Sequence, residues 1–144
     1  MQPDRMVLIV VGGGIAAYKA LEAIRLFRRL GVRTRAVLTR AAQEFVTPLA
    51  VGALTEDKVY SDLFDLTDEA EMGHIELSRD ADLILVMPAT ADLLAKMAHG
   101  LADDLASTVL LATDAPVMVA PAMNVRMWEH PATRTNIATL VSRG

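Results

Sequence analysis

Hydrophobic positions along the chain group into four short segments with the character of β-strands, separated by segments with helical spacing. The strand segments are Met6–Val11, Arg33–Leu38, Asp82–Met87 and Ala115–Ala120. Three of them are almost continuously apolar, which is typical of parallel strands that are buried on both faces.

Apolar residues that recur every three or four positions predict helices between and after these strands. The expected helices are Ile15–Leu30, Ala41–Phe45, Pro48–Leu54, Ala91–His99, Leu101–Ala112 and Pro131–Arg143. Thr90 is suited to cap a helix start, and Gly31 and Gly100 are suited to end helices. Val59–Tyr60 is too short to assign.

This alternation of strands and helices with short connections predicts a single α/β domain over residues 1–144. We expect a doubly wound parallel sheet in three layers, with a Rossmann-like or flavodoxin-like arrangement. In such a sheet the carboxyl ends of the strands meet at one edge, and ligands bind there.

The composition and net charge of the chain favour some classes of function and exclude others. The chain has 144 residues, of which 53% are hydrophobic and 4% aromatic, and its formal net charge is −4. An apolar content this high in a small domain favours burial against other subunits, so we expect a homo-oligomer. The acidic balance argues against a nucleic-acid partner, and no apolar run is long enough to span a membrane. Because the chain has no Cys, it forms no disulfide or thiolate metal site, which favours a cytoplasmic location.

A glycine turn, Gly12–Gly14, separates the first strand from the first helix. Backbone N–H groups at such a turn can hold a phosphate. The spacing loosely matches a dinucleotide-binding fingerprint, but the second strand ends in Thr39–Arg40 instead of the acidic residue that would hold an NAD ribose. A hydroxyl and a cation fit a mononucleotide phosphate or a flavin edge better. The alternative is a tight turn that needs glycine for steric reasons.

Two further strand ends carry distinctive residues. Pro88–Asp92 follows the third strand, and Pro121–Trp128 follows the fourth. In the second segment the side-chain amide of Asn124 is suited to gripping a carboxylate, and Met127 supplies apolar surface beside it. The alternative is that Asn124 only caps a helix while Met127 and Trp128 belong to the core. Lys96 and His99 are expected to be surface residues.

His74 is the candidate general base. It follows Gly73 at the expected start of a short helix, where the positive end of the helix favours a neutral imidazole. A neutral imidazole can accept a proton from a substrate. The alternative is a purely structural histidine. The acidic stretch before it, from Asp62 to Glu71, has no spacing typical of a metal site, so we expect a surface loop and no metal.

The order Pro-Ala-Met-Asn-x-x-Met-Trp at 121–128, together with His74 and Pro88–Asp92, resembles the flavin-containing cysteine decarboxylases. The resemblance runs from Met6 to about Arg143. It implies FMN as the cofactor, His74 as the catalytic base, and a substrate site formed by Asn124, Met127 and Ala122. The FMN contacts that it implies are Gly13, Gly14, Ile15, Thr39, Arg40, Ala41, Thr90, Ala91, Asp92, Leu93 and Ala122. At 90, 92 and 93 the family usually has Ser, Asn and Thr, so side-chain roles at 92 and 93 are open.

The activity that the resemblance implies is the FMN-dependent oxidative decarboxylation of a cysteine-derived carboxylate. The expected substrate is 4'-phosphopantothenoylcysteine and the product 4'-phosphopantetheine, in coenzyme A biosynthesis. Oxidation of the thiol to a thioaldehyde creates an electron sink, after which carbon dioxide leaves and an enethiol remains. The family also implies a homotrimer or dodecamer with FMN at subunit contacts, and a synthetase domain joined to the decarboxylase in longer chains.

One feature of the coenzyme A enzymes is missing. They use a downstream Cys to complete the reduction to a saturated thiol, whereas this chain has no Cys. We therefore expect a fragment that lacks its C-terminal strand and Cys-bearing segment, and that stops at the enethiol. The alternatives are a decarboxylase of a peptide C-terminal cysteine, a flavin prenyltransferase, and a non-catalytic FMN-binding regulatory subunit. The basic phosphate-binding motif of the prenyltransferases has no equivalent in the chain.

Overall fold

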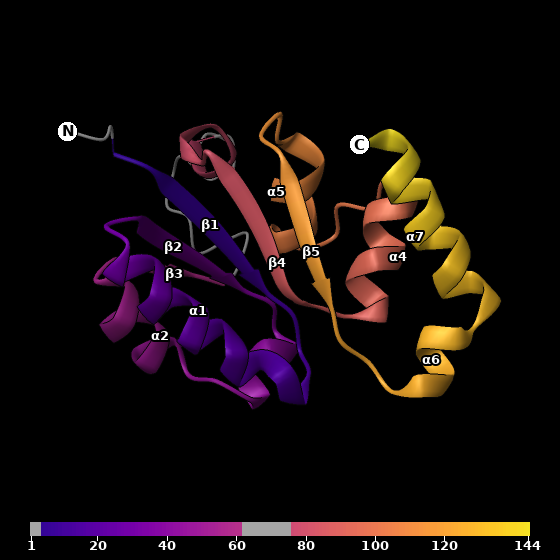
Figure 1. The fold of residues 1–144 in the computed structure, drawn as a ribbon, viewed down its shortest axis with the longest axis horizontal. Helices are drawn as coiled ribbons and strands as arrows, with labels where there is room; N and C mark the ends of the chain where they lie inside the picture. Colours follow the sequence, from indigo (N-terminus) through magenta and orange to yellow (C-terminus); the bar gives the residue numbers. More distant parts are fainter. Residues whose placement is uncertain (1–3, 62–75) are drawn as a thin grey trace.

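A parallel sheet forms the centre of the molecule (Figure 1). The computed structural model describes residues 4–61 and 76–144. Within these residues the sheet has five strands in the order β3-β2-β1-β4-β5, and every pairing is parallel. The strands are β1 (Met6–Val11), β2 (Arg33–Leu38), β3 (Val59–Tyr60), β4 (Leu83–Ala89) and β5 (Val117–Pro121). The order reverses between β1 and β4, which is the switch point of a Rossmann-like sheet, so the predicted fold class is confirmed.

Helices cover the sheet in two layers (Figure 1). Helices α1 (Tyr18–Arg29) and α2 (Pro48–Thr55), with the 3-10 turns η1 (Ile15–Ala17) and η2 (Ala41–Glu44), pack on one face. Helices α4 (Ala91–His99), α5 (Leu105–Ala112) and α7 (Pro131–Arg143), with a short helix at residues 76–80, pack on the other face. The short helix α6 (Val125–Glu129) lies beyond the end of β5 and leads into α7.

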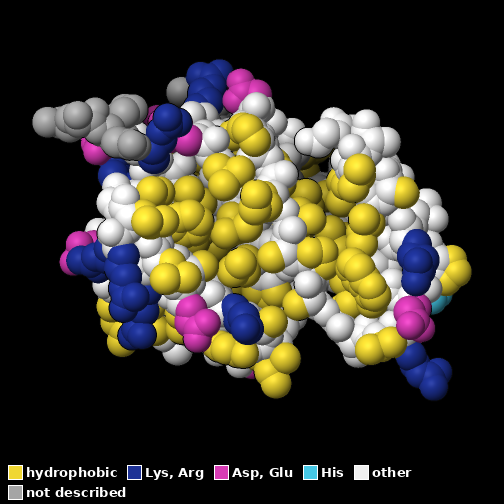
Figure 2. Space-filling model, in the orientation of Figure 1, with side chains coloured by type: hydrophobic (Ala, Val, Ile, Leu, Met, Phe, Trp, Pro, Cys, Tyr) yellow, Lys and Arg dark blue, Asp and Glu magenta, His cyan; other side chains and the backbone are white. Residues whose placement is uncertain are grey.

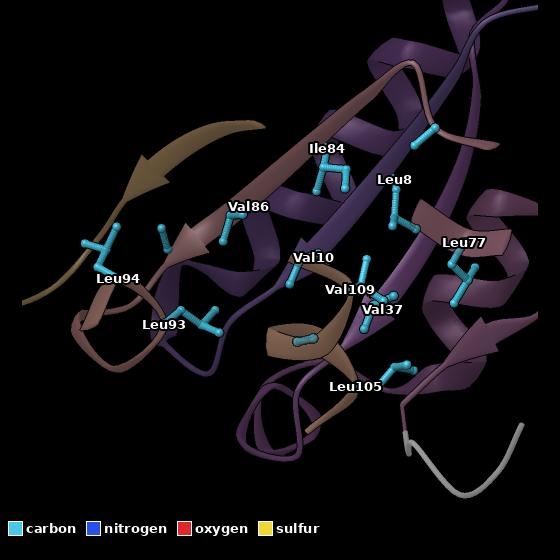
Figure 3. Close-up of a cluster of buried hydrophobic side chains, with 13 residues drawn as sticks. Leu8, Val10, Val37, Leu77, Ile84, Val86, Leu93, Leu94, Leu105 and Val109 are labelled. Atoms are coloured by element: carbon cyan, nitrogen blue, oxygen red, sulfur yellow. The ribbon is translucent and has the colours of Figure 1, made fainter. Parts of the chain in front are cut away.

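Strand β1 separates two cores. All six of its residues are buried, and alternate side chains point to opposite faces. Leu8 and Val10 face α5, and Ile9 and Val11 face α1. Figure 3 shows the first of these cores, where β1 and β4 side chains meet Leu105 and Val109 of α5. Burial on both faces explains why β1 reads as a continuous apolar run.

Several predicted boundaries change. β3, left unassigned from sequence, pairs with β2 over two residues. β4 continues through Pro88 instead of closing there, because the pairing with β5 shifts register between Val86 and Ala89, and proline is tolerated at such an irregularity. The helix expected over Leu101–Ala112 begins at Leu105.

The late start of α5 has a local cause. Asp104 caps the helix: its carboxylate accepts a hydrogen bond from the backbone N–H of Ser107 at 2.8 Å, and the Ser107 hydroxyl accepts from the backbone N–H of Asp104 at 3.2 Å. This reciprocal pair fixes the first turn at Leu105. The predicted boundary at Leu101 was therefore too early.

Lys96 was also predicted wrongly as a surface residue. Its side chain is only 17% exposed and its ammonium pairs with three carboxylates, those of Asp92, Asp103 and Asp104. His99, the other residue of this helix expected at the surface, is exposed.

Beyond β4, the α1 face of the sheet loses its helical cover. Met118 of β5, which pairs in register with the buried Leu85 of β4, is 57% exposed. Figure 2 shows hydrophobic side chains gathered over β4 and β5 on this face. An apolar sheet face of this kind is a surface that another chain can cover.

Candidate functional site

The carboxyl ends of β1, β4 and β5 are tied together by backbone hydrogen bonds. The N–H of Gly12, just after β1, donates to the carbonyl of Pro88 at 3.1 Å. The N–H of Ala122, just after β5, donates to the carbonyl of Ala89 at 3.2 Å. These two bonds bring the glycine turn, the start of α4 and the segment before α6 to one place at the switch point of the sheet.

A pocket of about 550 Å³ lies between these three segments. In Figure 2 the molecule is notched at this edge, between the part that carries α1 and the part that carries α6. The pocket is lined by Gly13, Gly14, Ile15, Ala16, Thr90, Ala91, Ala122, Met123, Asn124 and Met127. Eight of these ten residues were predicted as site residues. The other two, Ala16 and Met123, sit inside the same motifs and could have been found from their position between predicted residues.

The three glycines of the turn differ in how much space a side chain would have. A Cβ at Gly12 would lie 2.4 Å from the carbonyl oxygen of Pro88, and a Cβ at Gly13 would lie 2.3 Å from the Cβ of Ala41. Both positions therefore need glycine for internal packing. At Gly14 the nearest protein atom would be 4.0 Å away, and its backbone is extended (φ −157°, ψ 166°), a conformation open to any residue. The steric explanation accounts for two of the glycines, and Gly14 instead borders open space in the pocket.

The residues at the end of β2 support this turn from behind instead of lining the pocket. The N–H of Thr39 donates to the carbonyl of Val11 at 3.1 Å, and its hydroxyl accepts from the N–H of Ala42 at 3.0 Å. Ala41 packs directly against Gly13. The side chain of Arg40 is exposed and does not line the pocket.

The start of α4 forms a second wall. Thr90 caps the helix, since its hydroxyl accepts from the N–H of Leu93 at 3.2 Å. The positive end of the α4 dipole therefore faces the pocket beside Thr90 and Ala91. The side chains of the two neighbouring predicted residues turn elsewhere: Asp92 pairs with Lys96 at 3.3 Å, and Leu93 is buried in the core.

Asn124 has the capping role that the sequence left open, and it also lines the pocket. It caps α6, because its side-chain oxygen accepts from the backbone N–H of Met127 at 2.9 Å. Along the parts of the chain that the structure covers, no protein group accepts from the side-chain N–H₂ of Asn124, so the donor end of the amide is open at the pocket. Met127 and Trp128 are 44% and 45% exposed, so the alternative that they belong to the core is wrong.

Among the residues that the structure describes, none that lines the pocket has an ionisable side chain. Its polarity comes from the Thr90 hydroxyl, the Asn124 amide, and backbone N–H groups at the glycine turn. Such a lining suits a largely apolar, planar ligand with a few hydrogen-bonding positions and a phosphate held by the backbone.

His74, the predicted catalytic base, lies outside the residues that the structure describes, and so does the acidic stretch that precedes it. Over residues 4–61 and 76–144 there is no group of three or more side chains arranged to hold a metal ion. Among the helices in the same ranges, none is both long and apolar enough to cross a bilayer.

A second, larger cavity lies away from this edge. It is a groove of about 850 Å³ beside the free edge of β5, between α5 and the pair α4 and α7. Apolar side chains such as Leu110, Leu111 and Leu140 form most of its wall, with Lys96 and Arg143 among its polar residues. None of the residues predicted for the site lines this groove.

The whole chain, residues 1–144, matches the sequence profile of the family described as Flavoprotein. The chain is 51% identical over 140 residues to the coenzyme A biosynthesis bifunctional protein CoaBC of Vibrio vulnificus (strain YJ016), a match that covers 97% of this chain and 35% of that protein. The chain thus spans about a third of the length of the curated relatives it matches.

Solved structures give the same relationship. The crystal structure of SpaF, an FMN-dependent cysteine decarboxylase, is similar with a TM-score of 0.90 and 33% identity, covering 97% of this chain and 81% of that chain. A PPC decarboxylase variant complexed with pantothenoylaminoethenethiol is similar with a TM-score of 0.81 and 32% identity, covering 97% of this chain and 79% of that chain. The profile match over every residue and the similarity to these proteins lead to one conclusion: the chain belongs to the flavoprotein family.

Proposed function

We propose that the pocket at the ends of β1, β4 and β5 binds FMN, and that the chain decarboxylates a cysteine-derived acid there. The proposed substrate is 4'-phosphopantothenoylcysteine, which places the reaction in coenzyme A biosynthesis. The relative from Vibrio vulnificus is named for that pathway, and a similar solved structure is a PPC decarboxylase. The chain's share of its relatives' length supports a further proposal, that it acts beside a synthetase domain in a longer protein.

The main observation in support of this proposal is the open space beside the Cα of Gly14. Neither its backbone conformation nor any neighbouring protein atom requires glycine there. A ligand that approaches the backbone closely is the remaining physical reason to keep the position free of a side chain. The open backbone beyond it, at Ile15 and Ala16, begins a helical turn whose first N–H groups have no partner within the turn.

These features fit FMN. The N–H groups of Gly14, Ile15 and Ala16 would hold the phosphate, and Thr39 to Ala41 would keep the turn in place from behind. Thr90 and Ala91 would border the flavin from the start of α4. When bound, FMN supplies the two-electron oxidant that the reaction needs.

The chain's own residues would place the substrate. The N–H₂ of Asn124, which has no acceptor among the described residues, would donate to the substrate carboxylate, and the cap bond to Met127 would hold the amide in place. Met127 and Ala122 would pack on the substrate's apolar part. Because the described residues of the lining are uncharged, they would hold the carboxylate by hydrogen bonds without a paired cation. A weakly neutralised carboxylate leaves more readily as carbon dioxide.

The chemistry follows from the substrate's carbon skeleton. Removal of two electrons from the CH₂–SH group gives a thioaldehyde adjacent to the carbon that bears the carboxylate. The C–CO₂ bond then breaks, its electron pair moves toward sulfur, and an enethiol forms. We propose that His74 accepts the proton in the oxidation step.

The role of His74 has a direct test. In the variant His74→Asn, FMN binding should persist and carbon dioxide release should fall to background, because the base is lost while the pocket is not. Turnover near that of the parent would refute the assignment.

The alternative substrate is the C-terminal cysteine of a peptide, since SpaF is a cysteine decarboxylase and has a TM-score of 0.90 to this chain. Both substrates carry the same thiol and carboxylate, so the pocket serves either. Carbon dioxide release, measured with 4'-phosphopantothenoylcysteine and with cysteine-terminated peptides, distinguishes the two substrates. We expect carbon dioxide from the first and an enethiol product of matching mass. A saturated thiol would contradict the proposal that a chain without Cys cannot complete the reduction.

We further propose that the protein works in the cytoplasm as a homotrimer or a dodecamer built from trimers. The uncovered apolar face around Met118 gives a second copy a surface to bury. Light scattering of the purified protein tests this, and a monomer at micromolar concentration would contradict it.

A further inference from the structure

The side chain of Lys96 links the first turn of α4 to the segment that leads into α5. Its ammonium lies 3.3 Å from a carboxylate oxygen of Asp92, 3.2 Å from one of Asp103 and 3.7 Å from one of Asp104. Asp92 is in the first turn of α4, whereas Asp103 and Asp104 precede α5. Only 17% of the Lys96 side chain is exposed, whereas the carboxylates of Asp92 and Asp103 face solvent, with 72% and 65% of their side chains exposed.

The electrostatics of the cluster favour the charged lysine. Burial alone would lower the pKa of Lys96, but the hydrogen bond with Asp103 and the charges of Asp104 and Asp92 outweigh it and raise the pKa above its usual value. The same hydrogen bond lowers the pKa of Asp103. Without the ammonium, three like charges would face one another across the gap between α4 and α5.

The opposite side of the first turn of α4 is a wall of the pocket. A methyl carbon of Thr90 and one of Leu93 each lie 3.0 Å from the position that a Cβ on Gly12 would occupy. The turn therefore rests directly on the glycine turn on one side and is held by Lys96 on the other. A shift of the turn away from α5 would move Thr90 and Ala91, both of which line the pocket.

We propose that Lys96 is a positioning residue for the flavin pocket: by pairing Asp92 with Asp103 and Asp104, it holds the first turn of α4 against the glycine turn. This inference rests on the proposed binding of FMN. Lys96 itself does not line that pocket, so its effect passes through the helix start.

Three variants test the inference. Lys96→Met keeps the length and apolar stem but removes the charge, and Lys96→Arg keeps the charge. Arg143→Ala is the matched control, because the Arg143 guanidinium donates to the carbonyl of Ala98 at 2.9 Å and so fixes the other end of α4. For each variant the Kd for FMN is measured by quenching of flavin fluorescence, and the thermal midpoint by circular dichroism.

We expect Lys96→Met to bind FMN about tenfold more weakly than the parent. High ionic strength should narrow that gap, because salt screens the repulsion among the three carboxylates. Lys96→Arg should bind within about twofold of the parent. Arg143→Ala should lower the thermal midpoint and leave the Kd unchanged.

Other results would contradict the positioning role of Lys96, or the proposed binding of FMN as well. Equal Kd values for the parent and Lys96→Met would refute the positioning role while the FMN proposal stands. If Arg143→Ala lost as much FMN affinity as Lys96→Met, the loss would reflect general destabilisation of the fold and not positioning by Lys96. If Lys96→Met does not fold, Asp103→Asn replaces it, since that side chain is 65% exposed; a weaker loss in the same direction supports the role, and no loss refutes it. A parent protein that binds no FMN overturns the proposed function and this inference with it.

Discussion

Two concave regions of this molecule, the pocket at the switch point and the groove beside β5, differ in what builds their walls. The pocket is bordered mainly by short side chains and backbone, at glycines, alanines and Thr90. The groove beside β5 is larger, about 850 Å³ against 550 Å³, and is bordered mainly by long apolar side chains. The larger cavity contains none of the predicted chemistry. Position at the carboxyl ends of the strands, with backbone open to a ligand, identifies the site better than volume does.

The same difference predicts how each region responds to substitution. If the pocket binds FMN and the substrate as proposed, an added atom there would meet the flavin, and an altered polar group would meet the substrate. In the groove, an altered apolar side chain should change only local packing; Lys96, which also lines the groove, is the exception because its ion pairs reach the first turn of α4. Four substitutions, from the largest expected effect to the smallest, test this contrast.

Asn124→Asp should lower carbon dioxide release by about a hundredfold or more, because a carboxylate in place of the amide repels the substrate carboxylate. The helix cap should survive, since Asp also accepts from the N–H of Met127. The thermal midpoint measured beside the turnover separates the two roles. Unchanged turnover in this variant would remove Asn124 from the substrate site.

Gly12→Ala should destabilise the fold by about 1–3 kcal/mol, because the new methyl group would lie against the carbonyl of Pro88. Chemical denaturation measures the change. If the variant unfolds at the same denaturant concentration as the parent, the close contact between the ends of β1 and β4 is not a packing constraint.

Thr90→Val should cost about 1 kcal/mol, because it removes the hydroxyl that caps α4 and keeps the shape of the side chain. Thr90→Ser retains the hydroxyl and is the control. Equal stability of the two variants would mean that the cap contributes nothing.

Leu111→Ser lies in the groove, at a side chain that is 59% exposed. It should change the free energy of unfolding by no more than about 0.5 kcal/mol and leave FMN binding unchanged. A clear loss of FMN affinity would show that the apolar wall of the groove is coupled to the pocket, and the contrast between the two walls would fail.

The fold and most of the pocket could be predicted from sequence for one physical reason. Continuous apolar runs identify parallel strands, and the carboxyl ends of parallel strands share an edge. Residues as distant in sequence as Gly14, Thr90 and Asn124 were therefore expected together, and the structure brings them into one pocket. The local cap roles of Thr90 and Asn124 followed from their side-chain chemistry.

What the sequence did not predict depends on contacts between distant residues. Lys96 has an ordinary place in a helix, and only the turn after Gly100 brings Asp103 and Asp104 to it. β3 is too short to carry a period, and it exists because β2 offers an edge to pair with. Asp92 and Leu93 follow pocket residues in the motif, yet helix geometry turns their side chains away.

The central claim is that the open space at Gly14 belongs to FMN, and a binding titration with Gly14→Val tests it most directly. The parent should bind FMN with a flavin absorption spectrum that persists through gel filtration. Gly14→Val should keep the parent's thermal midpoint, because a Cβ there would meet, among the described residues beyond its chain neighbours, only a methyl group of Thr90 at 4.0 Å, and it should lose FMN binding by about a hundredfold or more. FMN binding by Gly14→Val equal to that of the parent would contradict the account.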